Sequence, residues 1–309
     1  MNTTELLNAI KRAITVPQYQ ARFSDADIIA LANEEQEATI VPIILSVREE
    51  YFVVRELVPT IAGDNKILIP PRAVGRTLRE IDYRIAPGAG TFRLNRIQLE
   101  SAFTFTDPTV VGTPTGFYMM SDAMYMVPTP NIAGTLILWY FLRANTLVPT
   151  SSTGTITSVQ PTGVTLDLVP STIVVGSLVD IIDNTPGFQT VYKDLVVQSI
   201  AGKAITITGF DPTNVNPFMV LCPAQTTSII QMPIESQQML VWAVCVRMLQ
   251  ALAIPDQLAI ARQELSNKIK AGTELLSPRV EGSLPKIIQP NNLLRSSNSL
   301  TSFFNSPVV

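Results

Sequence analysis

The sequence contains no histidine and little charge, and both shortages limit what the protein can do. Without histidine the chain cannot build a Ser-His or Cys-His catalytic pair, or any histidine metal site. Charged residues make up only 15% of the 309 residues, against about a quarter in typical globular domains. Because a monomer of this size normally covers itself with charge, we expect the chain to bury surface against partners.

Cysteines and long apolar runs are also scarce. The two cysteines, Cys222 and Cys245, lie far apart without a CxxC spacing, so we expect small core residues in a reducing compartment. No stretch approaches the roughly 20 apolar residues of a membrane helix, and the longest runs, such as residues 134–142, fit strands. The polar, acidic N-terminus does not resemble a secretory signal.

The sequence motifs of common enzymes are missing too. There is neither a Walker A loop nor a GxGxxG fingerprint, and Gly88 and Gly90 predict only a turn. Asp180 and Asp183 could be paired acids or calcium ligands, but on an alternating strand they face opposite sides. We therefore expect no catalytic residue, metal or cofactor, and a protein that works by contact.

The charge that is present is unevenly distributed. The net charge is −3, so the chain as a whole lacks the basic footprint of a nucleic-acid binder. The segment 25–50 is acidic and opposed only by Arg48, whereas the segment 72–96 is rich in arginine and opposed by Glu80 and Asp82. Neighbouring segments of opposite sign suit a contact between copies or within one copy, or are simply solvated faces. The acids are Asp25, Asp27, Glu34, Glu35, Glu37, Glu49 and Glu50, and the arginines are Arg72, Arg76, Arg79, Arg84, Arg93 and Arg96.

The first three arginines raise the question of phosphate binding. No aromatic stacking platform is interleaved with Arg72, Arg76 and Arg79, and two acids share the segment. We therefore favour pairing with carboxylates of a neighbouring subunit. Glu34 and Glu35, in the acidic segment, are predicted to be helix-surface charges.

Apolar periodicity predicts helices at both ends of the chain. The first spans residues 4–15, and the second begins after the N-cap Ser24 and continues to about Arg48, with a kink or break at Pro42. Two antiparallel helices, or one long kinked helix, are expected from Pro233 to about Leu276.

Between these helices the pattern is that of strands. Alternating or β-rich runs occur at 51–58, 66–69, 77–85, 91–97, 115–120, 123–127 and 135–143, and the last should be central in its sheet. After a small polar linker at 149–154, five short strands follow within roughly 70 residues, which is typical of a small barrel or sandwich.

The fold class expected is α+β. It combines a helical bundle of N- and C-terminal helices with a central antiparallel β region and an inserted small β-barrel or sandwich domain. The expected divisions are a core of N-terminal helices and strands at 1–150, the inserted all-β domain at 151–222, C-terminal helices that complete the core at 223–283 and an extended tail at 284–309.

Four segments in this order carry a resemblance to a known family. They are SDADIIALANEE at 24–35, VPIILSVREEYFV at 41–53, IPPRAVGRTLREI at 69–81 and LLSPRVEG at 275–282. The series resembles the head-to-tail adaptor (connector or neck) proteins of tailed bacteriophages. The resemblance covers the helical ends and the segment around Arg72, but not the β module at 151–222.

The resemblance implies a structural virion protein and no enzyme. Its copies would form a ring, dodecameric in this family, at the head-tail junction after assembly in the host cytoplasm. The implied partners are other copies of the chain, the portal protein, further tail or neck proteins and DNA that passes without sequence recognition, with no membrane. The residues expected at subunit or portal contacts are Arg72, Arg76, Arg79, Glu34, Glu35, Leu284, Ile287, Ile288, Leu293, Leu294, Phe303 and Phe304.

Two alternatives remain open. One is another phage tail or capsid-accessory structural protein. The other is a module that binds a carbohydrate or host surface through the β insertion. Such modules usually expose several aromatics, and the insertion has only Phe188, Tyr192, Phe210 and Phe218, which disfavours this alternative.

Overall fold

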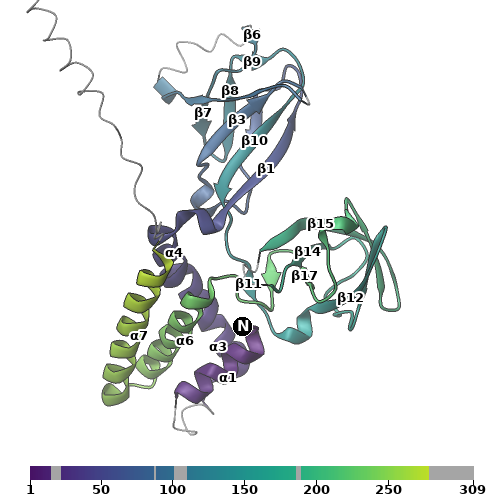
Figure 1. The fold of residues 1–309 in the computed structure, drawn as a ribbon. Helices are drawn as coiled ribbons and strands as arrows, with labels where there is room; N and C mark the ends of the chain where they lie inside the picture. Colours follow the sequence, from purple (N-terminus) through teal and green to yellow (C-terminus); the bar gives the residue numbers. More distant parts are fainter. Residues whose placement is uncertain (15–21, 87, 101–109, 186–188, 278–309) are drawn as a thin grey trace, which may run out of the picture. The chain divides into compact units, whose positions relative to one another are not determined.

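The computed structural model describes residues 1–14, 22–86, 88–100, 110–185 and 189–277. Figure 1 shows a mixed α+β chain in which two β modules lie, in sequence order, between helices from the two ends of the chain. The predicted α+β class and the inserted β-barrel are therefore confirmed.

The second N-terminal helix begins after Ser24, as this capping residue predicts, and the first begins at Thr3, one residue before its predicted start. Helix α1 (Thr3–Ala13) has a capping box formed by Asn2 and Glu5, and α3 (Asp25–Glu35) has one formed by Ser24 and Asp27. The predicted disturbance at Pro42 is also present. The chain widens into a π-helical segment (Gln36–Ile40) before α4 (Val41–Val47), because Pro42 has no N–H to continue the regular ladder.

The C-terminal helices are two separate helices, α6 (Ile234–Ala251) and α7 (Pro255–Leu276), which lie side by side (Figure 1). One hydrophobic core contains side chains from helices at both ends of the chain. It includes Leu6 and Ile10 of α1, Ile28 of α3, Ile44 of α4, Leu240 and Val244 of α6, and Leu276 of α7, each at most 3% exposed.

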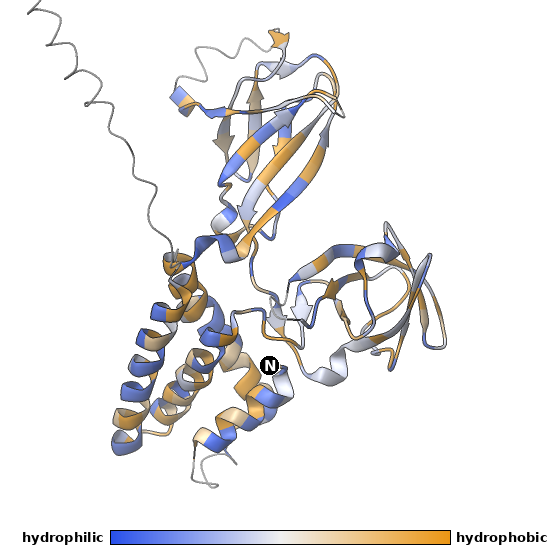
Figure 2. Cartoon of the chain, in the orientation of Figure 1, coloured by the Kyte–Doolittle hydropathy of each residue, from blue (hydrophilic) through white to orange (hydrophobic). Residues whose placement is uncertain are grey.

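The first β module is a pair of packed four-stranded sheets. One sheet has the order β1-β10-β3-β4, and its long strand β10 is central, as predicted. The other has the order β2-β8-β7-β5, in which β5 and β7 are parallel, so the region is not antiparallel throughout. Figure 2 shows apolar and polar bands along β1, because its sequence VVRELVPT places the charged pair Arg55 and Glu56 between two apolar pairs. The strands are β1 (Val53–Thr60), β2 (Lys66–Leu68), β3 (Glu80–Arg84), β4 (Thr91–Arg93), β5 (Asn95–Arg96), β7 (Gly116–Met120), β8 (Ala123–Val127) and β10 (Gly134–Phe141), with a small parallel pair of β6 (Val111–Gly112) and β9 (Thr129–Pro130).

The second β module is a closed six-stranded barrel of order β12-β13-β16-β15-β14-β17. Five of its strands were predicted. The sixth, β17, closes the barrel by pairing with both β12 and β14. Where the chain enters and leaves the barrel, β11 (Thr146–Leu147) and β18 (Thr226–Thr227) pair in parallel. The barrel strands are β12 (Gly154–Gln160), β13 (Gly163–Leu166), β14 (Leu178–Ile182), β15 (Thr190–Ala201), β16 (Ala204–Thr208) and β17 (Val220–Pro223).

Single helical turns complete the description. A 3-10 turn (Glu49–Phe52) leads into β1, and another (Val74–Arg76) follows the loop that carries Arg72. Two more turns, Thr150–Ser152 and Pro212–Asn214, flank barrel strands.

Candidate functional site

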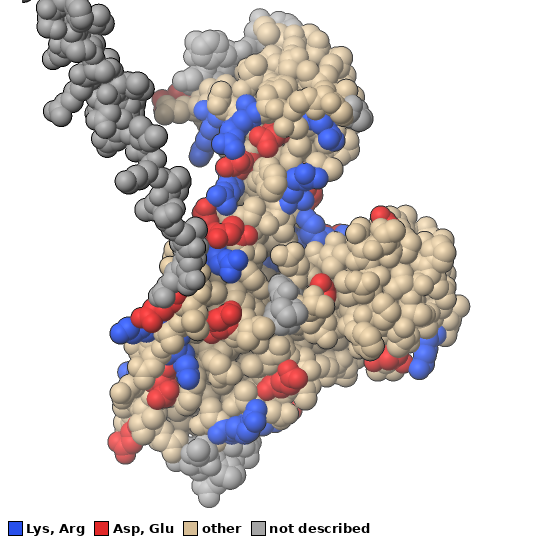
Figure 3. Space-filling view, viewed as in Figure 1, with Lys and Arg blue, Asp and Glu red and all other residues tan. Residues whose placement is uncertain are grey.

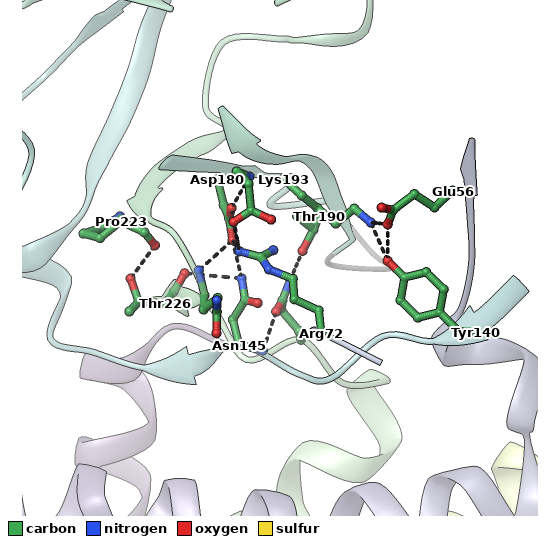
Figure 4. A network of polar contacts seen from close by, with 12 residues as sticks. Glu56, Arg72, Tyr140, Asn145, Asp180, Thr190, Lys193, Pro223 and Thr226 are labelled. Carbon is green, nitrogen blue, oxygen red and sulfur yellow. Dashed lines mark hydrogen bonds and ion pairs between the residues drawn. The ribbon is translucent and has the colours of Figure 1, made fainter. Parts of the chain in front are cut away.

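A buried ion pair joins the first β module to the barrel. Arg72 lies in the loop after β2, and its Nη2 donates to both carboxylate oxygens of Asp180 on β14, at 2.9 and 2.8 Å (Figure 4). The same nitrogen lies 3.0 Å from Oδ1 of Asp194 on β15. The Arg72 side chain is 5% exposed and that of Asp180 is fully buried, so the pair lies in the interior of the protein.

Asp180 is well satisfied in spite of its burial. Besides Arg72 it accepts hydrogen bonds from the backbone amides of Asp194 and Gln225, both at 3.0 Å, and from Asn145 Nδ2 at 3.2 Å. A buried carboxylate is tolerated only with such partners, because desolvation penalises the charge. Asp180 is therefore the acceptor on which four segments of the chain converge.

A second polar cluster lies beside the first. Lys193 on β15 contacts Glu56 Oε2 of β1 at 2.7 Å and the hydroxyl of Tyr140 of β10 at 2.6 Å, and that hydroxyl donates to Glu56 at 2.5 Å (Figure 4). We call the two clusters together the polar junction: Arg72, Asp180, Asp194, Asn145, Lys193, Glu56 and Tyr140.

The surroundings shift several pKa values in the polar junction. Burial alone would raise the pKa of Glu56, but the hydrogen bonds from Lys193 and Tyr140 outweigh it and lower that pKa. Burial, together with the bond to Glu56, raises the pKa of Tyr140. Burial also raises the pKa of Asp194 against the opposing charge of Arg72. The phenol is thus held neutral: it donates to Glu56 within the first β module and accepts from Lys193 of the barrel.

The lowered pKa of Glu56 gives a pH-dependent stability. A group whose pKa is lower in the folded than in the unfolded chain, where it is about 4.3, stabilises the fold above that value, and the contribution is lost as the pH falls through the folded pKa. We expect Glu56→Gln to unfold more readily than the wild type at pH 7. The difference should vanish once Glu56 is protonated. Thermal unfolding of both proteins from pH 7 to pH 3 measures it, and a difference independent of pH would contradict the role of the carboxylate.

The three arginines expected at subunit contacts each have an acidic partner in the same chain. Arg72 is buried, so it is not part of a surface that another copy could reach. Arg79 pairs with Glu49 at 2.7 Å, and the exposed side chains of Arg76 and Asp122 lie 3.5 Å apart. The Arg79–Glu49 pair joins the arginine-rich and acidic segments within one copy. The sequence had allowed such a contact either within one copy or between copies.

The two glutamates of the acidic segment differ in exposure. Glu34 is exposed, as predicted for a helix-surface charge. The prediction is wrong for Glu35, which is 7% exposed and accepts from Arg247 Nε of α6 at 2.6 Å and from Thr39 Oγ1 at 2.8 Å. Its side chain faces α6 and not solvent because the helical segment packs against that helix. The other expected contact residues, Leu284, Ile287, Ile288, Leu293, Leu294, Phe303 and Phe304, lie outside the described residues.

Other candidate groups have structural roles. Asp183 accepts from the amide and hydroxyl of Thr185 and does not share a site with Asp180. Cys222 and Cys245 are buried, and burial raises the pKa of each thiol to about 12, as suits the predicted core residues. Of the barrel aromatics in the described residues, Phe218 is exposed, while Tyr192 and Phe210 pack against each other.

Sequence reasoning missed most of the polar junction. One signal was available, because Asp180 interrupts an otherwise apolar run in which Val179, Ile181 and Ile182 are buried. An acid in such a run needs a buried cation or several donors. Nothing local, however, points from Asp180 to Arg72, which lies 108 positions away.

The part of the chain that the structure describes has neither a membrane-spanning helix nor a group of metal-binding side chains. No helix in this part of the chain is both long and apolar enough to cross a membrane. No group of three or more Cys, Asp or Glu side chains there is placed to hold a metal ion. The sequence matches no protein-family model and no curated protein.

Proposed function

We propose that this protein is a head-to-tail adaptor of a tailed bacteriophage, a structural virion protein whose copies form a ring, dodecameric in the family it resembles, between the portal and the tail. The observation that carries the proposal is the shared core of helices from both ends of the chain, with two β modules extending from it. In this proposal the terminal helices act as a helical bundle that forms the body of the ring. The β modules then contact neighbouring neck proteins.

The polar junction suits a part that must transmit force. It joins the barrel to the first β module by charge-assisted hydrogen bonds, which are roughly twice as strong as neutral ones and depend on geometry. A ring through which DNA passes also benefits from weak attraction to phosphate, and the net charge of −3 agrees with this.

The sparse surface charge supports extensive contact with partners. On the face shown in Figure 3, both β modules carry wide areas without charged side chains. Exposed aliphatic residues occur on each module. They include Ile61, Val111 and Ile132 on the first and Val174, Val175 and Leu178 on the barrel, each at least 45% exposed.

Exposed charges that have no strong partner among the described residues are the candidates for a contact between copies. Glu34 and Arg96 are both exposed, and Glu37 is 3.9 Å from Arg143 with its side chain 73% exposed. In a ring, different faces of one copy meet, so acids of one copy can face arginines of the next.

We expect native mass measurement and electron microscopy of the purified protein to show rings. Glu34→Lys and Arg96→Glu should each raise the concentration needed for half-assembly by about tenfold, because like charges then face each other across the interface. The double variant should recover assembly if the two residues pair. The proposal would be contradicted if the protein stayed monomeric at every concentration, both alone and with the portal protein. Lys203→Glu, in the β15–β16 hairpin, is the matched charge-reversal control and should assemble normally.

A further inference from the structure

Strand β1 is the longest edge strand in the two sheets of the first β module. It ends the order β1-β10-β3-β4, so it pairs with β10 on one side and with no strand of the described residues on the other (Figure 1). The other edge strands, β2, β4 and β5, have three, three and two residues, whereas β1 has eight. An edge of this length presents a row of unpaired backbone groups.

The hydrogen bonds between β1 and β10 determine which backbone groups of β1 face the open edge. In an antiparallel pair, residues that bond the neighbouring strand alternate with residues whose N–H and C=O point away from it. The amide of Leu142 donates to the carbonyl of Phe52 at 2.8 Å, so every second residue from Phe52 onward bonds β10. The backbone groups of Arg55 and Leu57 therefore point toward the open edge.

Two further observations agree with this alternation. The carbonyl of Trp139, which lies opposite Arg55, accepts from the amide of Arg79 at 2.8 Å, beside β3 and away from β1. Pro59, which has no N–H, occupies one of the outward positions, where a proline removes no bond to β10. Within the described part of the chain, the N–H and C=O groups of Arg55 and Leu57 have no hydrogen-bond partner.

The side chains of Arg55 and Leu57 lie on one face of the sheet, because they are two positions apart in a strand. Arg55 is exposed and has no acidic partner among the described residues, and Leu57 is 48% exposed. A strand added beside β1 would place one residue opposite each of them. Complementarity requires a carboxylate opposite Arg55 and an apolar side chain opposite Leu57.

Two occupants from this chain itself fit the edge poorly. If β1 of a second copy paired with it in an antiparallel register, Arg55 would face Arg55, Glu56 would face Glu56, or Pro59 would face Arg55. The first two registers oppose like charges and the third lacks an N–H. The C-terminal segment 284–309 contains no aspartate or glutamate, so it cannot supply the carboxylate.

We propose that the open edge of β1 binds an extended segment of a partner protein, which adds an antiparallel strand like the other pairings of this sheet. Read from its N-terminus, the segment has an apolar residue opposite Leu57, one residue of any type, and an acidic residue opposite Arg55. Backbone bonds to Arg55 and Leu57 supply affinity, and the two side-chain pairs supply selectivity. This interaction goes beyond the adaptor function and does not require a ring.

The test uses the full chain and the capped peptide acetyl-Thr-Thr-Val-Thr-Asp-Thr-Thr-amide. At saturating concentration the peptide should slow hydrogen exchange of the amides of Arg55 and Leu57 by at least about tenfold, as measured by NMR. N-methylation of the peptide's valine removes an N–H that faces β1 and should weaken binding by at least about fivefold. N-methylation of the central threonine, whose N–H faces away, is the matched control and should change binding by less than about twofold.

Variants of the protein make the same test from the other side. Leu57→Pro removes the outward N–H and keeps the bonds to β10, so it should weaken binding by at least about fivefold more than Leu57→Ala, which keeps that N–H. Arg55→Glu should reverse the charge preference and favour a peptide with lysine in place of aspartate. If Leu57→Pro does not fold, the N-methylated peptides still test the backbone bonds on the unaltered protein.

Four outcomes would overturn the inference. The first is unchanged exchange at Arg55 and Leu57 with saturating peptide. The second is equal weakening by the two N-methylations, which would mean that only side chains make contact. The third is equal binding of the aspartate and lysine peptides by the unaltered protein. The fourth is slow exchange of both amides in the free protein that becomes fast on dilution, which would identify a second copy as the occupant.

Discussion

Asp180→Ala is expected to lower the free energy of unfolding by about 3–5 kcal/mol. The substitution leaves the guanidinium of Arg72 buried with only the half-exposed Asp194 as a counter-charge. It also removes the acceptor of two backbone amides and of Asn145. Each buried donor that loses its acceptor adds a desolvation cost. Urea unfolding followed by circular dichroism measures the effect.

Asp194→Asn is the matched control, because Asp194 has φ 54° and asparagine tolerates this left-handed conformation. Its side chain is 41% exposed and its carboxylate makes one contact with Arg72, so we expect a loss within about 1 kcal/mol. A loss for Asp180→Ala no larger than that of the control would show that the polar junction does not stabilise the fold. Because the first β module and the barrel share this acceptor, Asp180→Ala should also separate their unfolding transitions, which differential scanning calorimetry can resolve.

Gly163→Ala is expected to have the second large effect, a loss of about 1–3 kcal/mol or more. Gly163 on β13 pairs with Thr206 on β16, and an added Cβ would lie 2.0 Å from the carbonyl oxygen of Ile205. That oxygen belongs to the barrel backbone, which cannot move without breaking strand pairing. The thermal midpoint of the purified variant measures the loss.

Gly90→Ala is the control for this substitution. A Cβ at Gly90 meets no atom within 4 Å and the residue has no positive φ, so its stability should stay within about 0.5 kcal/mol of the wild type. Equal midpoints for the two variants would mean that β13 and β16 can separate at low cost. The barrel would then be less rigid than its closed ring of paired strands implies.

Local signals in the sequence were sufficient for most elements. The capping residue Ser24 begins a helix, Pro42 disturbs one, and the apolar run of β10 forms a central strand, because each effect acts within a few residues. The short β17 was missed because four residues give too little periodicity to separate a strand from a loop.

The candidate site was less accessible to sequence reasoning. Arg72 was identified as important, but its partner was sought in another copy, because its true partner lies 108 positions away on β14. Glu35 was taken for a surface charge because its sequence neighbours are acidic, whereas its environment is set by Arg247 of α6. In both cases the decisive contact depends on tertiary structure.

The parallel pairing of β11 with β18 has a consequence for how this chain could have evolved. Leu147 and Thr227 are direct partners, so the entry and exit of the barrel lie side by side, and a short linker could replace everything between them. The segment between β11 and β18 contains Asp180, Asp194 and Lys193, whereas their partners Arg72 and Glu56 lie outside it. A related chain without this segment would keep Arg72 without either of its carboxylate partners. We therefore expect the arginine at position 72 and the barrel to be gained and lost together.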